Sequence, residues 1–385
     1  MTGFAGREPV IVEAVRTPIG KRDGFFKETR ADEIGVIALK ALLERTSINP
    51  SEIEDVVFGC VTARGEQGFN IARIIALEAG LPIESAGVTV NRLCGSSQQA
   101  IHFAAQEIFA SVCDCAIAGG VESMTREPMG SDLDKPLNPK LLAQYEIVPQ
   151  GESAERIADQ WEISREELDE FSLQSHLKAA HAQDAGYFES QIAPVTINHR
   201  TITRDEGVRR YTSPEEGRAK LATLAPAFRP SGKITAGNSS QISDGAAALL
   251  LMTRDRAQAL GYKPRARFRS WAVAGVDPTI MLTGPIPATK KALQKAGLSL
   301  SDIDLFECNE AFASVPIAWG RELGVPWERV NVNGGAIALG HPLGATGAIL
   351  FTKILYELER RDAQFGLVTM CIGFGQGIAT VIERV

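Results

Sequence analysis

The sequence repeats itself at long range, and this repeat limits the folds open to the chain. Residues 43–54 read LERTSINPSEIE, and residues 293–304 read LQKAGLSLSDID. Each segment combines the end of a helix, a turn and the start of an apolar strand, and the two are offset by 250 residues. Two related halves are the simplest interpretation. Because strand-like and helical segments alternate in each half, we expect mixed or parallel sheets covered by helices.

The offset also predicts an insertion. The first half finishes near Ser123, which leaves residues 124–231 as a more polar segment with few strand-like runs. Within it, residues 154–182 are expected to be helical, opened by Ser153 and continued by a capping pattern at Ser164. We therefore predict three parts: residues 4–123 with 232–258, an inserted loop domain at 124–231, and residues 259–385.

Composition excludes several classes of protein. The net charge of −7 disfavours general nucleic-acid binding. No run approaches the roughly 18 apolar residues of a membrane span, and residues 1–9 show no secretory signal pattern. The six cysteines form no Cys-x-x-Cys pair, which disfavours a structural zinc site. Free thiols fit a reducing cytoplasm, and Cys113 and Cys115 are interpreted as core thiols of a buried strand.

Residues 199–233 are locally basic, with eight Arg or Lys residues against four Asp or Glu residues. A solvated surface is one interpretation of this segment. A docking site for a polyphosphate ligand is the other, because guanidinium groups pair well with phosphates.

Cys94 lies in the segment VNRLCGSSQQA, where a strand ends, a turn follows and a helix begins. Backbone N–H groups and the helix dipole favour a thiolate at such a position. The alternative is a buried structural cysteine, and the segment alone does not decide between them.

His341 lies in a glycine-rich loop, NGGAIALGHPLGATG, between Gly340 and Pro342. A histidine held there can accept the proton of Cys94, as in other Cys–His pairs. The alternative, a phosphate-binding loop, lacks the Lys-Ser or Lys-Thr that should follow.

Two further segments carry polar groups at expected strand ends. Cys371 and Gly373 lie in MCIGFGQG, whose glycine N–H groups can form an oxyanion hole. Asn309 and Glu310 stand between apolar neighbours in ECNEAF.

Taken together and in this order, these segments closely resemble the thiolase family along nearly the whole chain. The matching segments are residues 90–100, 119–124, 235–240, 244–248, 309–312, 333–347 and 370–377. The resemblance implies an α/β fold in which duplicated αβα halves form a five-layered αβαβα core with an inserted loop domain.

The resemblance also implies a role for each matching residue. Cys94 is similar to the acyl-accepting nucleophile, His341 to its base, and Cys371 to the acid/base of the acetyl-CoA α-carbon. Asn309 is similar to the residue that holds a water beside His341 in one oxyanion hole. The N–H groups of Cys94 and Gly373 resemble a second hole. Ser240 and Arg209 resemble contacts of coenzyme A, the latter within the basic segment.

The implied activity is that of an acetyl-CoA C-acyltransferase, which cleaves 3-ketoacyl-CoA with coenzyme A through an acyl-Cys94 intermediate and ping-pong kinetics. Acyl-CoA and coenzyme A are then substrates, and no metal or permanently bound cofactor is expected. The resemblance to thiolases also implies a cytoplasmic homodimer or homotetramer that acts in fatty-acid or steroid β-oxidation.

Two departures from the family bear on the type of thiolase. Phe374 replaces an expected small residue, and Gln150 replaces the methionine usual in degradative thiolases. Pro149 replaces the histidine usual in biosynthetic relatives, which favours the degradative type. A biosynthetic acetoacetyl-CoA thiolase, a ketoacyl synthase, a thiol redox protein and a non-catalytic CoA-binding homologue are the alternatives. The remaining histidines are expected to be structural or exposed: His102, His176, His181 and His199.

Overall fold

The computed structural model describes residues 7–385, so most of the segment examined for a secretory signal lies outside the described part. The first half contains β1 (Pro9–Arg16), β2 (Gly20–Lys21), α1 (Ala31–Thr46), β3 (Asp55–Gly59), α2 (Ile71–Glu78), β4 (Val88–Val90), α3 (Ser96–Phe109) and β5 (Cys115–Ser123). It is completed after the insert by β8 (Ser243–Thr253) and α8 (Arg254–Ala259).

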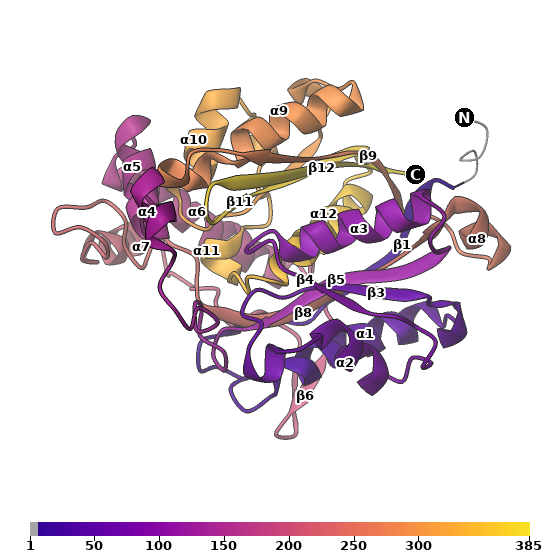
Figure 1. The fold of residues 1–385 in the computed structure, drawn as a ribbon. Helices are drawn as coiled ribbons and strands as arrows, with labels where there is room; N and C mark the ends of the chain where they lie inside the picture. Colours follow the sequence, from indigo (N-terminus) through magenta and orange to yellow (C-terminus); the bar gives the residue numbers. More distant parts are fainter. Residues whose placement is uncertain (1–6) are drawn as a thin grey trace.

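The second half contains β9 (Ala266–Gly275), α9 (Pro285–Ala296), β10 (Leu305–Cys308), α10 (Ser314–Leu323), α11 (Ala336–Leu339), α12 (Thr346–Arg360), β11 (Phe365–Ile372) and β12 (Gln376–Arg384). Figure 1 shows five layers. Helices α9 and α10 cover one half of the sheet, α3 and α12 lie in the middle, and α1 and α2 cover the other half. The predicted αβαβα arrangement is confirmed.

The strands of the two halves form one mixed sheet in the order β10-β11-β12-β9-β1-β8-β5-β3-β4, with β2 paired to β8. The two half-sheets join where Val10 and Ile11 of β1 pair with Arg267 and Ala266 of β9. Parallel pairs are β3 with β4, β3 with β5, and β10 with β11; the other pairs in this sheet are antiparallel.

The 250-residue repeat of the sequence is also a repeat of contacts. Helix α1 is capped by Ser47 with φ 49°, and α9 is capped by Gly297 with φ 68°, so both end in a left-handed cap. Glu54 accepts bonds from two N–H groups at the start of β5, and Asp304 accepts bonds from two at the start of β11. The two-halves interpretation is therefore confirmed.

The central helices α3 and α12 begin 250 residues apart and cross closely near their N-termini. A Cβ atom on Gly347 would lie 2.3 Å from the backbone nitrogen of Gln98, so only glycine fits. The N–H of Ala348 donates to Oγ of Ser97 at 3.0 Å. The loops that lead into these two helices, one carrying Cys94 and the other His341, therefore meet in the same region.

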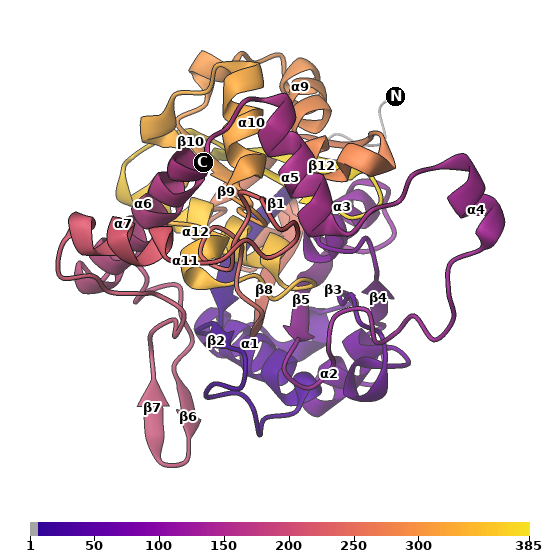
Figure 2. The ribbon, with the colours of Figure 1, turned by 90° about the vertical axis from the view of Figure 1, so that its left-hand side faces the viewer.

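The inserted segment contains α4 (Pro139–Gln144), α5 (Gln150–Gln160), α6 (Arg165–Asp184), β6 (Val195–Ile197), β7 (Arg200–Ile202) and α7 (Pro214–Ala222). Figure 2 shows α4 and the β6–β7 hairpin projecting from the body. A buried ion pair of 2.6 Å between Arg16 and Asp205 ties the segment to β1. The boundaries proposed for the three parts stay a prediction.

The helical character expected over residues 154–182 is confirmed for most of the segment, but the segment is not one continuous helix. The structure has two helices, because Glu162 adopts φ 50° and interrupts the run between them. The cap at Ser164 is confirmed, since its side chain accepts from Glu167 N at 3.1 Å. Helix α5 begins at Gln150, before Ser153. All six cysteines are free and buried, and the strand predicted around Cys113 begins at Cys115.

Candidate active site

Cys94 lies two residues before α3 and is 4% exposed. The turn that places it is tight, because Leu93 adopts φ 47°. Ser96 closes this turn: its Oγ donates to the carbonyl of Leu93 at 2.6 Å and accepts from Arg92 N at 2.9 Å. The sequence prediction of a cysteine beside a helix N-terminus is confirmed.

The surroundings of Cys94 are neutral hydrogen-bond donors. Burial raises the pKa of the Cys94 thiol. Hydrogen bonds from the N–H of Gly373, from the side chain of Gln150 and from its own N–H act in the opposite direction. The sulfur is a thiol at neutral pH and needs a base to become a nucleophile.

Cys371 is close to Cys94 at the C-terminal end of β11. It is fully buried, and its pKa is raised first by burial and then by negative charge on Cys94. The two sulfurs therefore lie near enough for a charge on one to affect the other, and Cys371 is a neutral thiol, a form that can give up a proton.

His341 is held by hydrogen bonds on both ring nitrogens. Its Nδ1 lies 2.6 Å from Oγ1 of Thr346, whose hydroxyl donates to the carbonyl of Pro342 at 2.9 Å. Nδ1 therefore carries the proton, and Nε2 accepts from Nδ2 of Asn309 at 3.3 Å. Burial lowers the pKa of His341 to about 4, so the imidazole is neutral and can accept a proton.

Asn309 follows β10 directly, and its N–H donates to Thr369 of the parallel strand β11 at 3.0 Å. The Asn309–His341 pair and Cys371 therefore share the C-terminal edge of these strands, where α/β sheets place their ligands. Oδ1 of Asn309 is buried without a hydrogen-bond partner. Such an acceptor suits a water or a substrate group.

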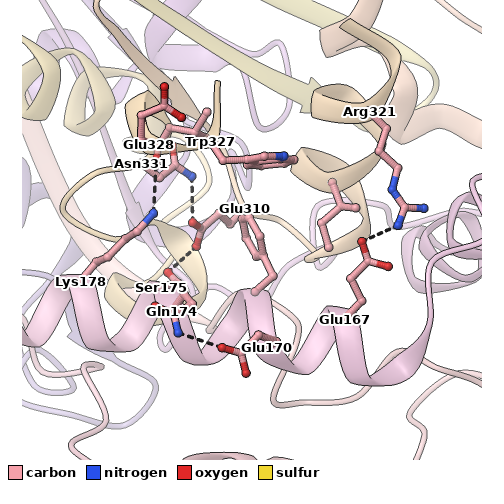
Figure 3. Close-up of a pocket in the computed structure, with 13 residues that line it drawn as sticks. Glu167, Glu170, Gln174, Ser175, Lys178, Glu310, Arg321, Trp327, Glu328 and Asn331 are labelled. Atoms are coloured by element: carbon pink, nitrogen blue, oxygen red, sulfur yellow. Dashed lines mark hydrogen bonds and ion pairs between the residues drawn. The ribbon is translucent and has the colours of Figure 1, made fainter. Parts of the chain in front are cut away.

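Glu310 fixes the loop that carries Asn309. Its carboxylate accepts from Ser175 Oγ at 2.7 Å, from Asn331 Nδ2 at 2.8 Å and from Ile337 N at 3.2 Å. Figure 3 shows this carboxylate between α6 and the Asn331 segment, beside a cavity of about 460 Å³. That cavity is lined by neither cysteine of the site, nor by His341 or Asn309.

Glu122 joins the His341 loop to the first half. Its carboxylate accepts from the N–H of Val61 at 2.9 Å, Thr62 at 3.0 Å and Gly344 at 2.8 Å. Burial raises the pKa of Glu122, and these hydrogen bonds oppose that rise. Glu122 therefore holds together two segments distant in sequence.

Ser240 and Arg209 lie outside the loops that carry the cysteines. The N–H of Ser240 donates to Ala311 at 2.9 Å, which places it beside the Asn309 segment. The N–H of Arg209 donates to Nδ1 of His176 at 3.1 Å. Arg209 lines a cavity of about 380 Å³ together with Arg210, Tyr211, Lys220, Leu221 and Leu224.

Sequence reasoning overlooked two groups that touch the site. Thr346 holds His341 by its hydroxyl, and the available signal was a hydroxyl residue at the first position of the helix after the histidine loop. Gln150 contacts Cys94. The sequence shows that Gln150 replaces the usual methionine, but it does not show where the side chain lies. Among residues 7–385, no cluster of His, Cys, Asp or Glu is suited to a metal ion. No helix of that range is long and apolar enough to cross a membrane.

The comparisons with known proteins identify the family of this chain. The N-terminal thiolase domain model matches residues 9–255, and the C-terminal model matches residues 262–384. A 3-ketoacyl-CoA thiolase of Serratia proteamaculans is 49% identical over 98% of this chain and 99% of its own. One of Bacillus subtilis is 46% identical, with the same coverage. An acetyl-CoA acetyltransferase of Bacillus anthracis has a TM-score of 0.90 at 40% identity and covers 98% of this chain and 99% of its own. The chain belongs to the thiolase family.

Proposed function

We propose that this protein is an acetyl-CoA C-acyltransferase that cleaves 3-ketoacyl-CoA with coenzyme A. The observation that carries the proposal is the convergence at Cys94. Hydrogen bonding by two backbone N–H groups lowers the pKa of Cys94, and the thiol of Cys371 lies near it. The neutral His341 precedes α12, which packs against α3, the helix that follows Cys94. Names of relatives add support, since curated proteins 46–49% identical are called 3-ketoacyl-CoA thiolases.

In the first half-reaction, Nε2 of His341 takes the thiol proton of Cys94. The thiolate attacks the 3-keto carbon, and the bond between C2 and C3 breaks. The electron pair leaves on acetyl-CoA as an enolate, which Cys371 protonates at C2. The water site at Asn309 and His341 stabilises the enolate oxygen.

In the second half-reaction, coenzyme A attacks the acyl group on Cys94 and gives its thiol proton to the Cys371 thiolate. The N–H groups of Cys94 and Gly373 stabilise the oxyanion of the tetrahedral intermediate. Cys94 leaves and recovers its proton from His341. A Cys94 thiolate would raise the pKa of Cys371, and acylation prevents that charge from forming, so Cys371 is easier to deprotonate beside the acyl-enzyme than beside the thiolate, as the reverse condensation requires.

We propose the cavity at Arg209 as the dock for the phosphates of coenzyme A. Its three cations and one aromatic ring suit a nucleotide polyphosphate, and they lie in the basic part of an acidic chain. Ser240 contacts the same ligand nearer the site. Coenzyme A is a substrate in this scheme, and no permanently bound cofactor takes part.

Two types of thiolase remain candidates, because one solved relative is called an acetyl-CoA acetyltransferase. Pro149 in place of a histidine favours degradation of chains longer than acetoacetyl-CoA, within fatty-acid or steroid β-oxidation in the cytoplasm. A panel of 3-ketoacyl-CoA substrates assayed with free coenzyme A tests this choice. Highest kcat/KM for acetoacetyl-CoA would favour the biosynthetic type instead.

We also propose a homodimer or homotetramer. Strand β4 ends the sheet, and an unpaired strand edge favours association. Large apolar side chains near it are exposed, among them Phe69, Ile83 and Val88. Light scattering coupled to size exclusion gives the mass that decides the number of subunits.

The central test of the function is Cys94→Ala. It should abolish turnover and the covalent acyl-enzyme while the circular-dichroism spectrum stays unchanged. Mass spectrometry after incubation with acyl-CoA should find the acyl group on Cys94 of the wild type alone. An acyl group on another cysteine of the variant would overturn the assignment, and labelling without turnover in the wild type would indicate a non-catalytic CoA-binding homologue.

A further inference from the structure

Gln150 is placed rigidly at the first position of α5. The next residue, Gly151, packs against the ring of Phe228 so closely that a Cβ atom there would lie 2.2 Å from it. Glu152 then pairs with Arg229 at 2.7 Å and Arg156 at 3.0 Å. The start of the helix is therefore anchored, and the side chain of Gln150 needs little reordering to make its contacts.

The amide of Gln150 reaches the reacting sulfur. The side chain of Gln150 and the N–H of Gly373 are both among the hydrogen-bonding groups that lower the pKa of Cys94. The same amide lies against Gly373, because a Cβ atom on that glycine would be 3.1 Å from Nε2 of Gln150. Backbone and side-chain donors thus approach one sulfur from adjoining positions.

A thiolate at Cys94 depends on such donors. The site is nearly closed to solvent, and the negative charge of Glu122 opposes a thiolate at Cys94 by raising its pKa. The imidazole of His341 is neutral before proton transfer. A buried anion without an adjacent cation is stabilised by hydrogen bonds to it, and these are stronger than bonds between neutral groups.

We propose that Gln150 is a catalytic residue whose amide donates to the sulfur of Cys94 and stabilises the thiolate from which the acyl-enzyme forms. The proposal rests on the proposed function, in which Cys94 is the nucleophile. It gives the side chain at position 150 the role of hydrogen-bond donor, which the thioether of a methionine there could not fill.

The test is the pH dependence of alkylation of Cys94 by iodoacetamide, followed by peptide mass spectrometry. It measures the thiolate directly and needs no turnover. Gln150→Met should slow alkylation of Cys94 at neutral pH about tenfold and move the profile to higher pH. Gln150→Glu should slow it further, because a carboxylate repels the thiolate. Gln160→Met, the same change at the exposed end of the same helix, should leave the profile unchanged.

Circular dichroism and the thermal midpoint verify folding of each variant, and Gln150→Ala replaces the methionine variant if that one fails to fold. An alkylation profile of Gln150→Met that coincides with the wild type would overturn the proposal. A rise in the KM of this variant without slower alkylation of Cys94 would overturn it as well. Failure of the proposed function looks different: the wild type would then show the expected alkylation profile without cleaving any 3-ketoacyl-CoA.

Discussion

The Oγ1 of Thr346 lies 2.6 Å from the Nδ1 of His341 and donates its own proton to the carbonyl of Pro342. A hydroxyl has one proton, so it can only accept from the imidazole. Thr346 thereby fixes the tautomer in which Nε2 is unprotonated and can take a proton. Since Thr346 is also the first residue of α12, the helix start and the orientation of the base depend on the same residue.

Thr346→Val should lower kcat about ten- to a hundredfold, because a hydrogen bond to a group that becomes charged is worth roughly 1.5–3 kcal/mol. KM should change little, since Thr346 acts through His341. Thr346→Ser keeps the hydroxyl and should recover most of the rate. Steady-state kinetics of both variants decide the matter, and equal losses in the two would refute a role for the hydroxyl.

Arg209→Glu should raise KM for coenzyme A about tenfold at low salt with a small effect on kcat, because a phosphate contact contributes mainly to uniform binding. The effect should shrink as ionic strength rises. Arg200→Glu makes the same charge change on the insert outside the 380 Å³ cavity and serves as the control. If both variants raise KM equally, the basic segment acts only as a solvated surface.

Much of this molecule could be predicted from local sequence. The repeat predicted two halves because helix caps, turns and strand starts follow from short segments such as those at Ser47 and Gly297. Cys94 was placed correctly, since a strand, a turn and a helix adjoin it. The break between α5 and α6 was not predicted, because the left-handed position there is occupied by Glu162 and not by a glycine.

Contacts between distant segments could not be predicted in the same way. Glu122 bonds to Gly344 across 222 residues, and nothing near either residue indicates the other. The contact of Gln150 with Cys94 depends on how the insert packs on the core, which local propensity does not determine. The proximity of Asn309 and His341 was expected only from the family resemblance.

Stability should fall as the pH decreases below about 6.5, the usual pKa of an unfolded histidine. Burial lowers the pKa of His102 to about 3, with the charges of Arg92 and Lys295 as smaller causes. Between these values the unfolded state binds one more proton at this position, so unfolding becomes easier by about 1.4 kcal/mol per pH unit. His176, lowered to about 3, and His341, lowered to about 4, act in the same direction.

His102→Gln isolates this contribution. Urea unfolding midpoints measured from pH 7 to pH 5 should fall less steeply for the variant than for the wild type, whatever its absolute stability. The exposed His199 offers a matched substitution, and His199→Gln should keep the wild-type dependence. Parallel curves for His102→Gln and the wild type would show that His102 is protonated in the folded protein.

Cys371→Ser should separate the two halves of the reaction. Burial and the neighbouring Cys94 keep Cys371 a neutral thiol, which can protonate an enolate, and a serine hydroxyl is a far weaker acid. Cys94 and His341 remain in the variant, so exchange of an acyl group between acyl-CoA and Cys94 should survive. Cleavage of 3-ketoacyl-CoA and deuterium uptake into acetyl-CoA should fall by about 10² to 10⁴-fold. Measuring that uptake beside acyl labelling of Cys94 gives the comparison. Proton exchange at the wild-type rate would make His341, in place of Cys371, the acid/base of the carbon.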